Sequence, residues 1–473
     1  MKMWSGRFRQ PLNPEFESWQ RSFPFDKQLL SEEVAASSAY AAALEKLGIL
    51  SAAECKQIVD ALRALESDAA RNAAILDDEE AEDIHHFVER ELVKRISEAG
   101  YKLHSGRSRN EQIATDLRLY VRSQIDEIVA LIADFADAFV AKASQAGEAE
   151  MPAYTHLQRA EPVLVAHWLL AYVEMFLRDA DRLKDCRERL SECPLGSGAI
   201  AGSTLPLDRK AMAKELSFNA PTANSMDATS DRDFAIEFTQ ALALLGVHLS
   251  RWAEEQIIFC TQEFGFVKLP ESFSTGSSAM PQKQNPDLLE LVRGKSARLM
   301  ANAQFMLANV KGLALAYNKD LQETQIPVFD SAQTATAMLS HSAGYMREVR
   351  FDFVRMKSAA QAHSMNAFAA ATYLSRKGVA FRRAHEVIGA AVRLCMDKGC
   401  ELEALSLDEL KALNPAFEND FYQAVKLEAV LDCHDVTGGT ARGRVKSALA
   451  DAKERISKMR IPETRRGAVY AHT

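Results

Sequence analysis

The sequence predicts an all-α protein, and three observations support this class. Residues 25–151, 222–269, 287–326 and 328–414 contain no proline, the residue that breaks helix interiors. Apolar residues recur at helical spacing in the first two of these stretches. The alternation of apolar and polar residues that marks a strand is hard to find. Many of the 14 prolines fall instead in short polar segments, so we expect long helices joined by a few special loops.

Two apolar stripes predict two long helices in the middle of the chain. The first consists of Leu117, Val121, Ile125, Ile128, Ile132, Phe135 and Phe139. The second consists of Phe234, Phe238, Ala241, Leu245, Leu249 and Trp252. A helix of about 30 residues is about 45 Å long, more than one small domain covers. We therefore expect a bundle of such helices, shared between subunits of a homo-oligomer.

Composition and charge bound the function. The 473 residues are 47% hydrophobic with a net charge of −8, which excludes a disordered chain and disfavours a nucleic-acid binder. We expect a small-molecule substrate and other protein chains as partners, with no nucleic acid and no membrane. Seven cysteines without CxxC spacing, and a start without an apolar signal core, predict a reduced, cytoplasmic protein.

The length allows about three domains. We place the boundaries near residues 110 and 362. The expected units are an N-terminal helical domain at 1–110, a central long-helix domain at 111–362 and a C-terminal helical domain at 363–473.

The segment GSSAMPQKQNPD at 276–287 differs from a scaffold loop because it combines a serine, Lys283 and Asn285 with accessible backbone N–H groups. Such a loop suits chemistry in which negative charge develops on a substrate. An ordinary connection between two helices is the alternative.

Two further segments suit a binding site. LHSGRSRNEQ at 103–112 places arginines and hydroxyls just before a long helix, where a carboxylate or phosphate binds well. A capped, solvated helix start, with Ser108 or Asn110 as the cap, is the alternative. MPAYTHLQRAEP at 151–162 places His156 in a polar loop between prolines, where a histidine is a better catalytic candidate than on an apolar helix face.

Other features favour scaffold or exclude chemistry. The acidic run at 77–86 lacks the spaced ligands and turn glycine of a Ca²⁺ site, so we expect most of it to be a solvated helix start. No GxGxxG, Walker loop or GxSxG occurs, which leaves dinucleotide, P-loop and α/β-hydrolase chemistry without support.

Seven motifs in order resemble those of the argininosuccinate lyase family, within the fumarase/aspartase superfamily. The superfamily's signature loop, GSSxMxxKxNP, is met from Gly276 to Pro286. The others are WSGRF at 4–8, SGRSRN at 105–110, YTHLQRAEP at 154–162, PLGSGAIAG at 194–202, NSMDATSDRDF at 224–234 and AYNKDLQE at 316–323. The resemblance covers nearly the whole chain.

The resemblance implies a three-domain α-helical subunit in a homotetramer with a many-helix core, and active sites each built from three subunits. The implied reaction is reversible cleavage of argininosuccinate into arginine and fumarate. A base removes the proton next to a carboxylate, and the guanidinium nitrogen leaves. No redox cofactor or metal is implied.

The family's functional residues match individual positions. Ser277 matches the catalytic base, Lys283 and Asn285 lie near it in the loop, and His156 and Glu290 match a His–Glu pair. The substrate-binding positions match Ser22, Asp26, Arg109, Asn110, Thr155, Arg232, Tyr317 and Gln322.

Alternatives stay open, and one of them, a changed substrate preference, is motivated by a departure from the family pattern at Gln325. Ala279, Gln284 and Glu161 differ from the usual residues, and Gln325 replaces a lysine. The alternatives are another fumarate-releasing lyase such as adenylosuccinate lyase, a lyase for a related N-substituted aspartate, or a catalytically silent, crystallin-like structural protein.

Overall fold

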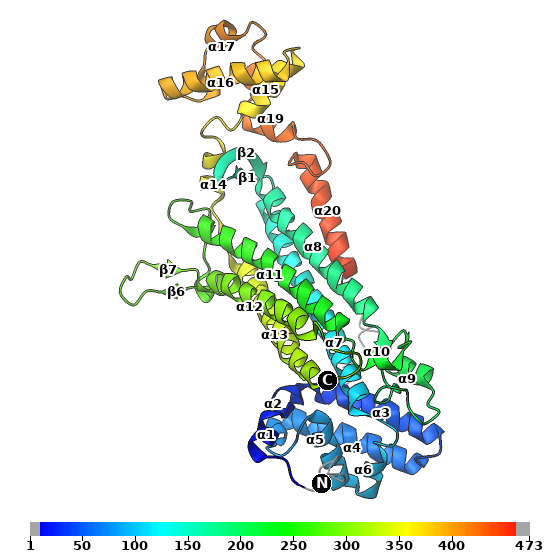
Figure 1. Ribbon diagram of the computed structural model, residues 1–473. Helices are drawn as coiled ribbons and strands as arrows, with labels where there is room; N and C mark the ends of the chain where they lie inside the picture. The colour runs from blue at the N-terminus through cyan, green and yellow to red at the C-terminus, as the bar shows by residue number, and fades with distance from the viewer. Residues whose placement is uncertain (1–9, 460–473) are drawn as a thin grey trace.

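The computed structural model describes residues 10–459, and these form an elongated, mainly helical molecule (Figure 1). A block of N-terminal helices lies at one end, long helices form the middle, and a small helical lobe lies at the other end. The all-α class is confirmed. Within the described part of the chain, no helix combines the length and the apolar run needed to cross a bilayer.

The N-terminal block packs against the starts of two long helices, those that begin at Arg109 and at Gln325. Its helices are α1 (Pro14–Trp19), α2 (Phe23–Asp26), α3 (Leu30–Lys46), α4 (Ala52–Arg71), α5 (Ile84–Ile96) and α6 (Glu98–Lys102), with 3₁₀ helices at Lys27–Leu29 and Ala73–Leu76. Side chains set where these helices begin. Asp83 caps α5 by accepting a hydrogen bond from the His86 amide at 2.7 Å.

Long helices form the central bundle, and they are α7 (Arg109–Ala146), α8 (Val165–Arg189), α11 (Asp233–Cys260), α12 (Asp287–Val310) and α13 (Gln325–Glu348). α7 packs along α8 and α13, and α11 packs along α12. Every side chain of the two predicted stripes is buried, the first on α7 and the second on α11. Both predicted helices are confirmed, because each stripe faces its neighbours.

Aromatic side chains join the bundle helices at its centre. The Phe135 ring on α7 lies 4.9 Å from the Phe176 ring on α8 and 5.0 Å from the Trp252 ring on α11, measured between centroids. Trp252 lies 5.6 Å from Tyr345 on α13. Aromatic pairs at these separations stabilise the fold beyond the contribution of their buried surface area.

Short strands and helices connect the long helices. β1 (Glu150–Thr155) and β2 (Gln158–Leu164) form an antiparallel hairpin that the sequence did not predict. The remaining strand pairs are β3 (Glu192–Cys193) with β4 (Ala220–Pro221), β5 (Val267–Lys268) with β8 (Arg350–Phe351), and β6 (Thr275–Gly276) with β7 (Gln284–Asn285). The connecting helices are α9 (Arg209–Glu215), α10 (Ser225–Ala228) and α14 (Phe353–Ala360), with 3₁₀ helices at Glu271–Phe273 and Lys319–Thr324.

The C-terminal lobe has a hydrophobic core of its own, apart from the core shared by the N-terminal block and the bundle. Its elements are α15 (Ala367–Arg376), α16 (Phe381–Lys398), a 3₁₀ helix at Leu402–Ala404, α17 (Leu407–Leu413) and α18 (Phe421–Ala424). The next helix, α19 (Leu427–Asp432), places Leu431 in the main core. The last helix, α20 (Arg442–Met459), runs back along α7 and α8 (Figure 1). The boundaries at 110 and 362 stay predictions.

Replacement of Phe135 by alanine tests whether the aromatic cluster stabilises the bundle. Phe135→Ala is expected to lower the free energy of unfolding by about 3–5 kcal/mol, because it leaves a cavity between three helices. Phe16→Ala is the matched control, since the Phe16 ring on α1 is 47% exposed. Denaturant unfolding at equal protein concentration measures both, and equal effects of the two substitutions would contradict the expectation.

Candidate functional site

The predicted site residues fall into three groups on the chain. One group lies where the N-terminal block meets the bundle, and we call it the basal group. It consists of Ser22, Asp26, Arg109, Asn110, Arg232, Tyr317 and Gln322. The other two groups are the hairpin tip, with Thr155 and His156, and the signature loop, residues 276–287, with Glu290 just after it on α12.

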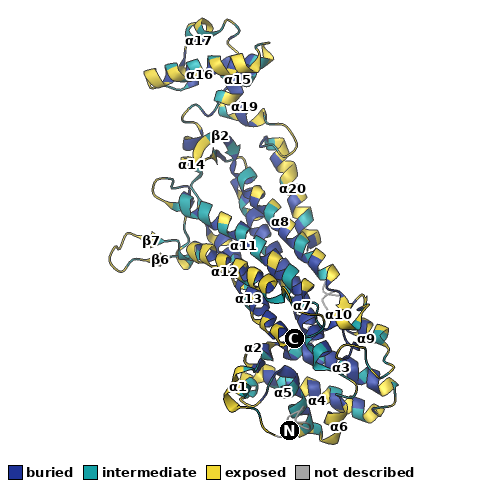
Figure 2. Ribbon diagram, in the orientation of Figure 1, coloured by how far each residue is buried: buried dark blue, intermediate teal, exposed yellow. Residues whose placement is uncertain are grey.

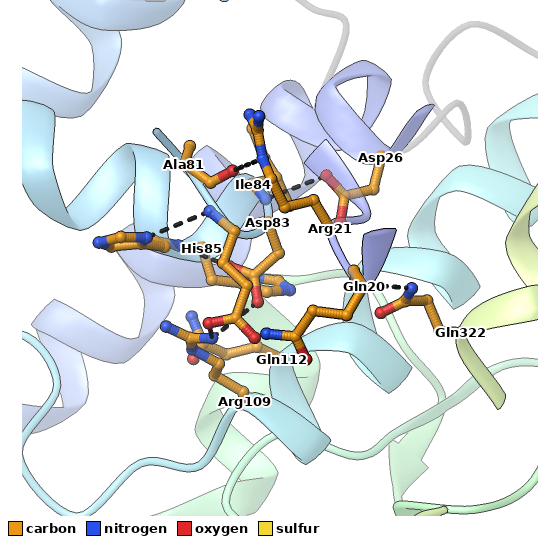
Figure 3. Close-up of polar contacts among 12 residues, drawn as sticks. Gln20, Arg21, Asp26, Ala81, Asp83, Ile84, His85, Arg109, Gln112 and Gln322 are labelled. Atoms are coloured by element: carbon orange, nitrogen blue, oxygen red, sulfur yellow. Dashed lines mark hydrogen bonds and ion pairs between the residues drawn. The ribbon is translucent and has the colours of Figure 1, made fainter. Parts of the chain in front are cut away.

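Arg109 stands at the start of α7, where the sequence left two candidate caps. Ser108 is the cap: its Oγ accepts a hydrogen bond from the Asn110 amide, and the Glu111 side chain accepts one from the Ser108 amide. The Arg109 Nη1 atom lies 2.9 Å from Asp83 Oδ2 and 3.2 Å from Glu82 Oε2 (Figure 3). These carboxylates hold the guanidinium at the helix start.

Asp26 is buried beside the same acidic residues. It is 2% exposed, and its Oδ1 accepts a hydrogen bond from the Ile84 amide at 3.0 Å (Figure 3). Burial and the nearby charge of Asp83 raise the pKa of Asp26 to about 7. Its charge therefore responds to groups that bind next to it.

Ser22 and Gln322 come from two segments that are distant in sequence, and both contact residues of the N-terminal block. The Ser22 amide donates to the Glu82 carbonyl at 2.9 Å, and its side chain bonds to Asp26. Gln322 Nε2 donates to the Gln20 carbonyl at 3.1 Å (Figure 3). The basal group thus combines the start of the chain with the 3₁₀ helix that follows α12.

Arg232, at the start of α11, is a buried cation with spare hydrogen-bond donors. It is 1% exposed, and Nη1 donates to the Asp231 carbonyl at 2.7 Å. Its Nε and Nη2 have no hydrogen-bond partner among the described residues. Burial lowers the pKa of Arg232 to about 10 and raises that of the neighbouring Tyr317. A buried cation with two free donors favours an anion as ligand.

The hairpin tip presents Thr155 and His156 to solvent. His156 and Leu157 form the two-residue turn between β1 and β2, with positive φ angles of 55° and 57°. A turn with two positive φ angles matches the twist of a hairpin but is unfavourable for residues other than glycine and asparagine. The turn keeps both His156 and Thr155 exposed.

The signature loop projects from the side of the bundle between β6 and β7 (Figure 1). Ser277 Oγ accepts hydrogen bonds from the amides of Ala279 and Met280, at 3.3 and 3.1 Å. Lys283 is exposed, and Asn285 Nδ2 donates to Thr275 Oγ1 at 3.4 Å. The loop therefore carries a serine with two N–H donors directed at its oxygen.

Glu290 follows the loop in the first turn of α12 and is exposed. Its Oε1 lies 3.9 Å from Arg293 Nη2. This weak surface pair leaves the carboxylate accessible.

Helix length separates the basal group from the other two groups within one chain. α7 has 38 residues and spans about 57 Å from Arg109 toward the hairpin tip. α11 has 28 residues and spans about 42 Å from Arg232 toward the signature loop. The basal group therefore lies at one end of these helices, and the other two groups follow their opposite ends (Figure 1).

The structure also places functional candidates that the sequence interpretation missed. The acidic run at 77–86 is solvated only in its first half, whereas Asp83 and His85 are buried. The expectation of a mostly solvated helix start was wrong for this second half, because Arg109 and Glu33 lie opposite it. The available signal was Asp83, a residue type that caps helices, because it stands three residues before His86, whose amide donates to it.

Two other features of the sequence are the departure at Gln325 and the WSGRF motif. Gln325, which departs from the family pattern, is buried at the start of α13, and its Oε1 has no partner among residues 10–459. The WSGRF motif at 4–8 lies outside the described residues.

Known proteins match nearly the whole chain. A family model described as "Lyase" matches residues 6–301, and one described as "Argininosuccinate lyase C-terminal" matches residues 364–432. The argininosuccinate lyase of Koribacter versatilis is 60% identical, covering 96% of this chain and 98% of that protein. That of Acidobacterium capsulatum is 58% identical, covering 97% and 96%.

A solved structure shares the fold. An EDDS lyase variant with bound fumarate matches with a TM-score of 0.81 and 24% identity, covering 96% of this chain and 92% of that chain. The two family models, the identities to curated relatives and the shared fold agree with one another. The chain belongs to the argininosuccinate lyase family.

Proposed function

We propose that the chain cleaves argininosuccinate reversibly into arginine and fumarate by base-catalysed elimination, in a site assembled from several subunits. The observation that carries the assembly is the separation of the basal group from the other two groups along α7 and α11. Two antiparallel copies bring the base of one bundle next to the far end of another. We propose that such copies form a homotetramer in which each site is shared between subunits.

The exposed face of α12 supports contact with another subunit. One stripe of α12 packs inward, whereas Leu291, Met300, Phe305 and Leu307 are exposed (Figure 2). By helical spacing, Leu291 and Phe305 lie on one side of the inward stripe, and Met300 and Leu307 lie on the other. Large exposed apolar side chains gathered on one helix indicate a protein interface. The cytoplasm is the proposed compartment, since all seven cysteines are free thiols.

Ser277 is the proposed base. A hydroxyl accepts a proton from carbon only when its alkoxide is stabilised, and the amides of Ala279 and Met280 donate to its oxygen. The alkoxide takes the proton next to the substrate carboxylate, the C=C bond of fumarate forms, and the bond to the guanidinium nitrogen breaks. Lys283 and Asn285 stabilise the negative charge that develops on the carboxylate.

His156 and Glu290 complete the proton transfer in this proposal. His156 donates a proton to the departing nitrogen or relays it, and Glu290 holds the imidazole in position. Both side chains are exposed within one chain, which suits residues that meet across a subunit contact.

The basal group binds the two ends of the substrate. The free donors of Arg232, together with Arg109 and Asn110, suit carboxylates, and Thr155 from the hairpin tip of another subunit adds a hydroxyl. Asp26, Tyr317, Ser22 and Gln322 suit the cationic arginine end. An arginine end next to Asp26 favours its ionised form, because opposite charges attract.

Fumarate release, followed by ultraviolet absorbance, tests this function. The purified chain is expected to act on argininosuccinate and not on adenylosuccinate, aspartate or malate. Ser277→Ala is expected to reduce turnover by about 10²–10⁴-fold with little change in assembly. Ser278→Ala, the neighbouring hydroxyl with no assigned role, is the control. Near-normal turnover of Ser277→Ala would show that another group is the base.

The raised pKa of Asp26 predicts how the free energy of unfolding depends on pH. Between about pH 4 and 7 the folded chain holds a proton on Asp26 that the unfolded chain has lost. The free energy of unfolding therefore falls as pH rises, by up to about 1.4 kcal/mol per pH unit. Asp26→Asn removes this contribution, so its stability relative to wild type is expected to increase with pH.

Denaturant unfolding from about pH 5 to about pH 7 measures the difference. Asp181→Asn on α8, whose side chain is 71% exposed, controls for loss of a carboxylate at the surface. A stability difference between Asp26→Asn and wild type that stays constant over this range would contradict the assignment.

A further inference from the structure

Behind the basal group, three ionisable side chains meet in the core of the N-terminal block. Glu33 comes from α3, His85 from α5 and Asp116 from α7, and all three are buried. One ligand atom of each lies within 4.8 Å of the others. The proposed reaction uses none of these groups.

Glu33 is the anion of this cluster. Its oxygens accept hydrogen bonds from Ser37 Oγ at 2.5 Å and from Gln112 Nε2 at 3.2 and 3.3 Å. His85 Nδ1 lies 2.8 Å from Oε2, and Arg107 Nη2 lies 3.9 Å from Oε1. Burial raises the pKa of Glu33, but the charge and hydrogen bond of His85 outweigh it and lower that pKa.

Asp116 has no such donors. It is 0% exposed, and neither oxygen has a hydrogen-bond donor within reach among residues 10–459. Glu32 and Glu33 face it from α3, His85 from α5 at 3.6 Å, and Arg107 from the turn before α7. Burial, and then the charge of Glu33, raise the pKa of Asp116 well above its usual range. An ionised Asp116 would be an unpaired buried charge next to another carboxylate.

We infer that Asp116 is protonated at neutral pH, donates its O–H to Glu33, and through Glu33 positions the helix starts that carry Arg109 and Asp83. His85 lies two residues after Asp83, and Gln112 lies three residues after Arg109. Figure 3 shows His85, Gln112 and Arg109 side by side at this junction. Asp116 is thus a positioning residue, and the inference rests on the proposed role of Arg109.

The same three side chains have a spacing that a divalent metal ion accepts. The charges argue against that use, because the Arg107 guanidinium lies 3.9 Å from Glu33 and repels a cation. The oxygens of Glu33 are also already engaged by Ser37, Gln112 and His85. Metal binding is therefore an outcome that the test distinguishes.

Replacement of Asp116 by asparagine or alanine separates these possibilities. Asparagine keeps the shape, the neutral charge and an N–H donor toward Glu33, so Asp116→Asn is expected to stay within about threefold of wild-type kcat/KM. Asp116→Ala removes the donor, and its KM is expected to rise about tenfold or more, with a smaller change in kcat. Recovery by asparagine together with a KM effect is not expected of a residue that only supports folding.

Infrared difference spectroscopy at about pH 8 tests the proton without any assay of activity, because Asp26 is mostly ionised there. The spectrum of Asp116→Asn is expected to lack one carbonyl band of a protonated carboxyl group. Asp126→Asn is the matched control on α7, since both Asp126 oxygens bond to Arg187, at 2.5 and 2.9 Å. It is expected to keep the band.

An unchanged band in Asp116→Asn, or equal losses of activity in the asparagine and alanine variants, would overturn the inference. Activity lost on chelation and restored by Zn²⁺ or Mn²⁺ would overturn it in favour of a metal site. A wild-type chain without activity on argininosuccinate would refute the proposed function alone, because the infrared result still decides the state of Asp116.

Discussion

The length of the bundle helices constrains the position of every functional group in this chain. α7 and α11 are straight connections of about 57 and 42 Å between the basal group and the opposite end of the bundle. Their buried stripes fix them against α8, α12 and α13. A chain built this way cannot bring its own Arg109 to its own His156 without unfolding the bundle.

The functional residues at the two ends of the bundle differ in burial. At the base, Arg232 is buried with two donors that have no partner among the described residues, and Asp26 is buried with its pKa raised to about 7. At the other end, His156 and Lys283 stand on exposed turns with few contacts. In the proposed assembly, the buried basal residues of one subunit hold the substrate, and the exposed residues of a neighbouring subunit supply the reactive groups.

The sequence predicted best what depends on local pattern. The stripes on residues 117–139 and 234–252 became helices with those side chains inward, because apolar spacing alone decides which helix face is buried. Residue type left Ser108 and Asn110 as candidate caps, and the structure selects Ser108, with Glu111 three positions later completing the capping box. The signature loop was recognisable from its letters, but the two amides directed at Ser277 Oγ come from its folded geometry.

Pattern could not predict contacts between residues far apart in sequence. Asp83 and His85 lie in an acidic run typical of a solvated helix start, and their burial depends on Arg109 and Glu33. Likewise the β1–β2 hairpin contains prolines and lacks clean alternation, and its strands pack against α14 and α19, which lie far away in the sequence.

Subunit mixing tests the central claim, that one site draws residues from several chains. Arg109→Ala removes a basal residue and His156→Ala removes a hairpin residue, so each variant alone is expected to have little activity. When the two are mixed and allowed to exchange subunits, some sites receive both intact residues, and fumarate release from argininosuccinate is expected to recover in part. No recovery after native mass spectrometry has confirmed mixed oligomers would contradict the account.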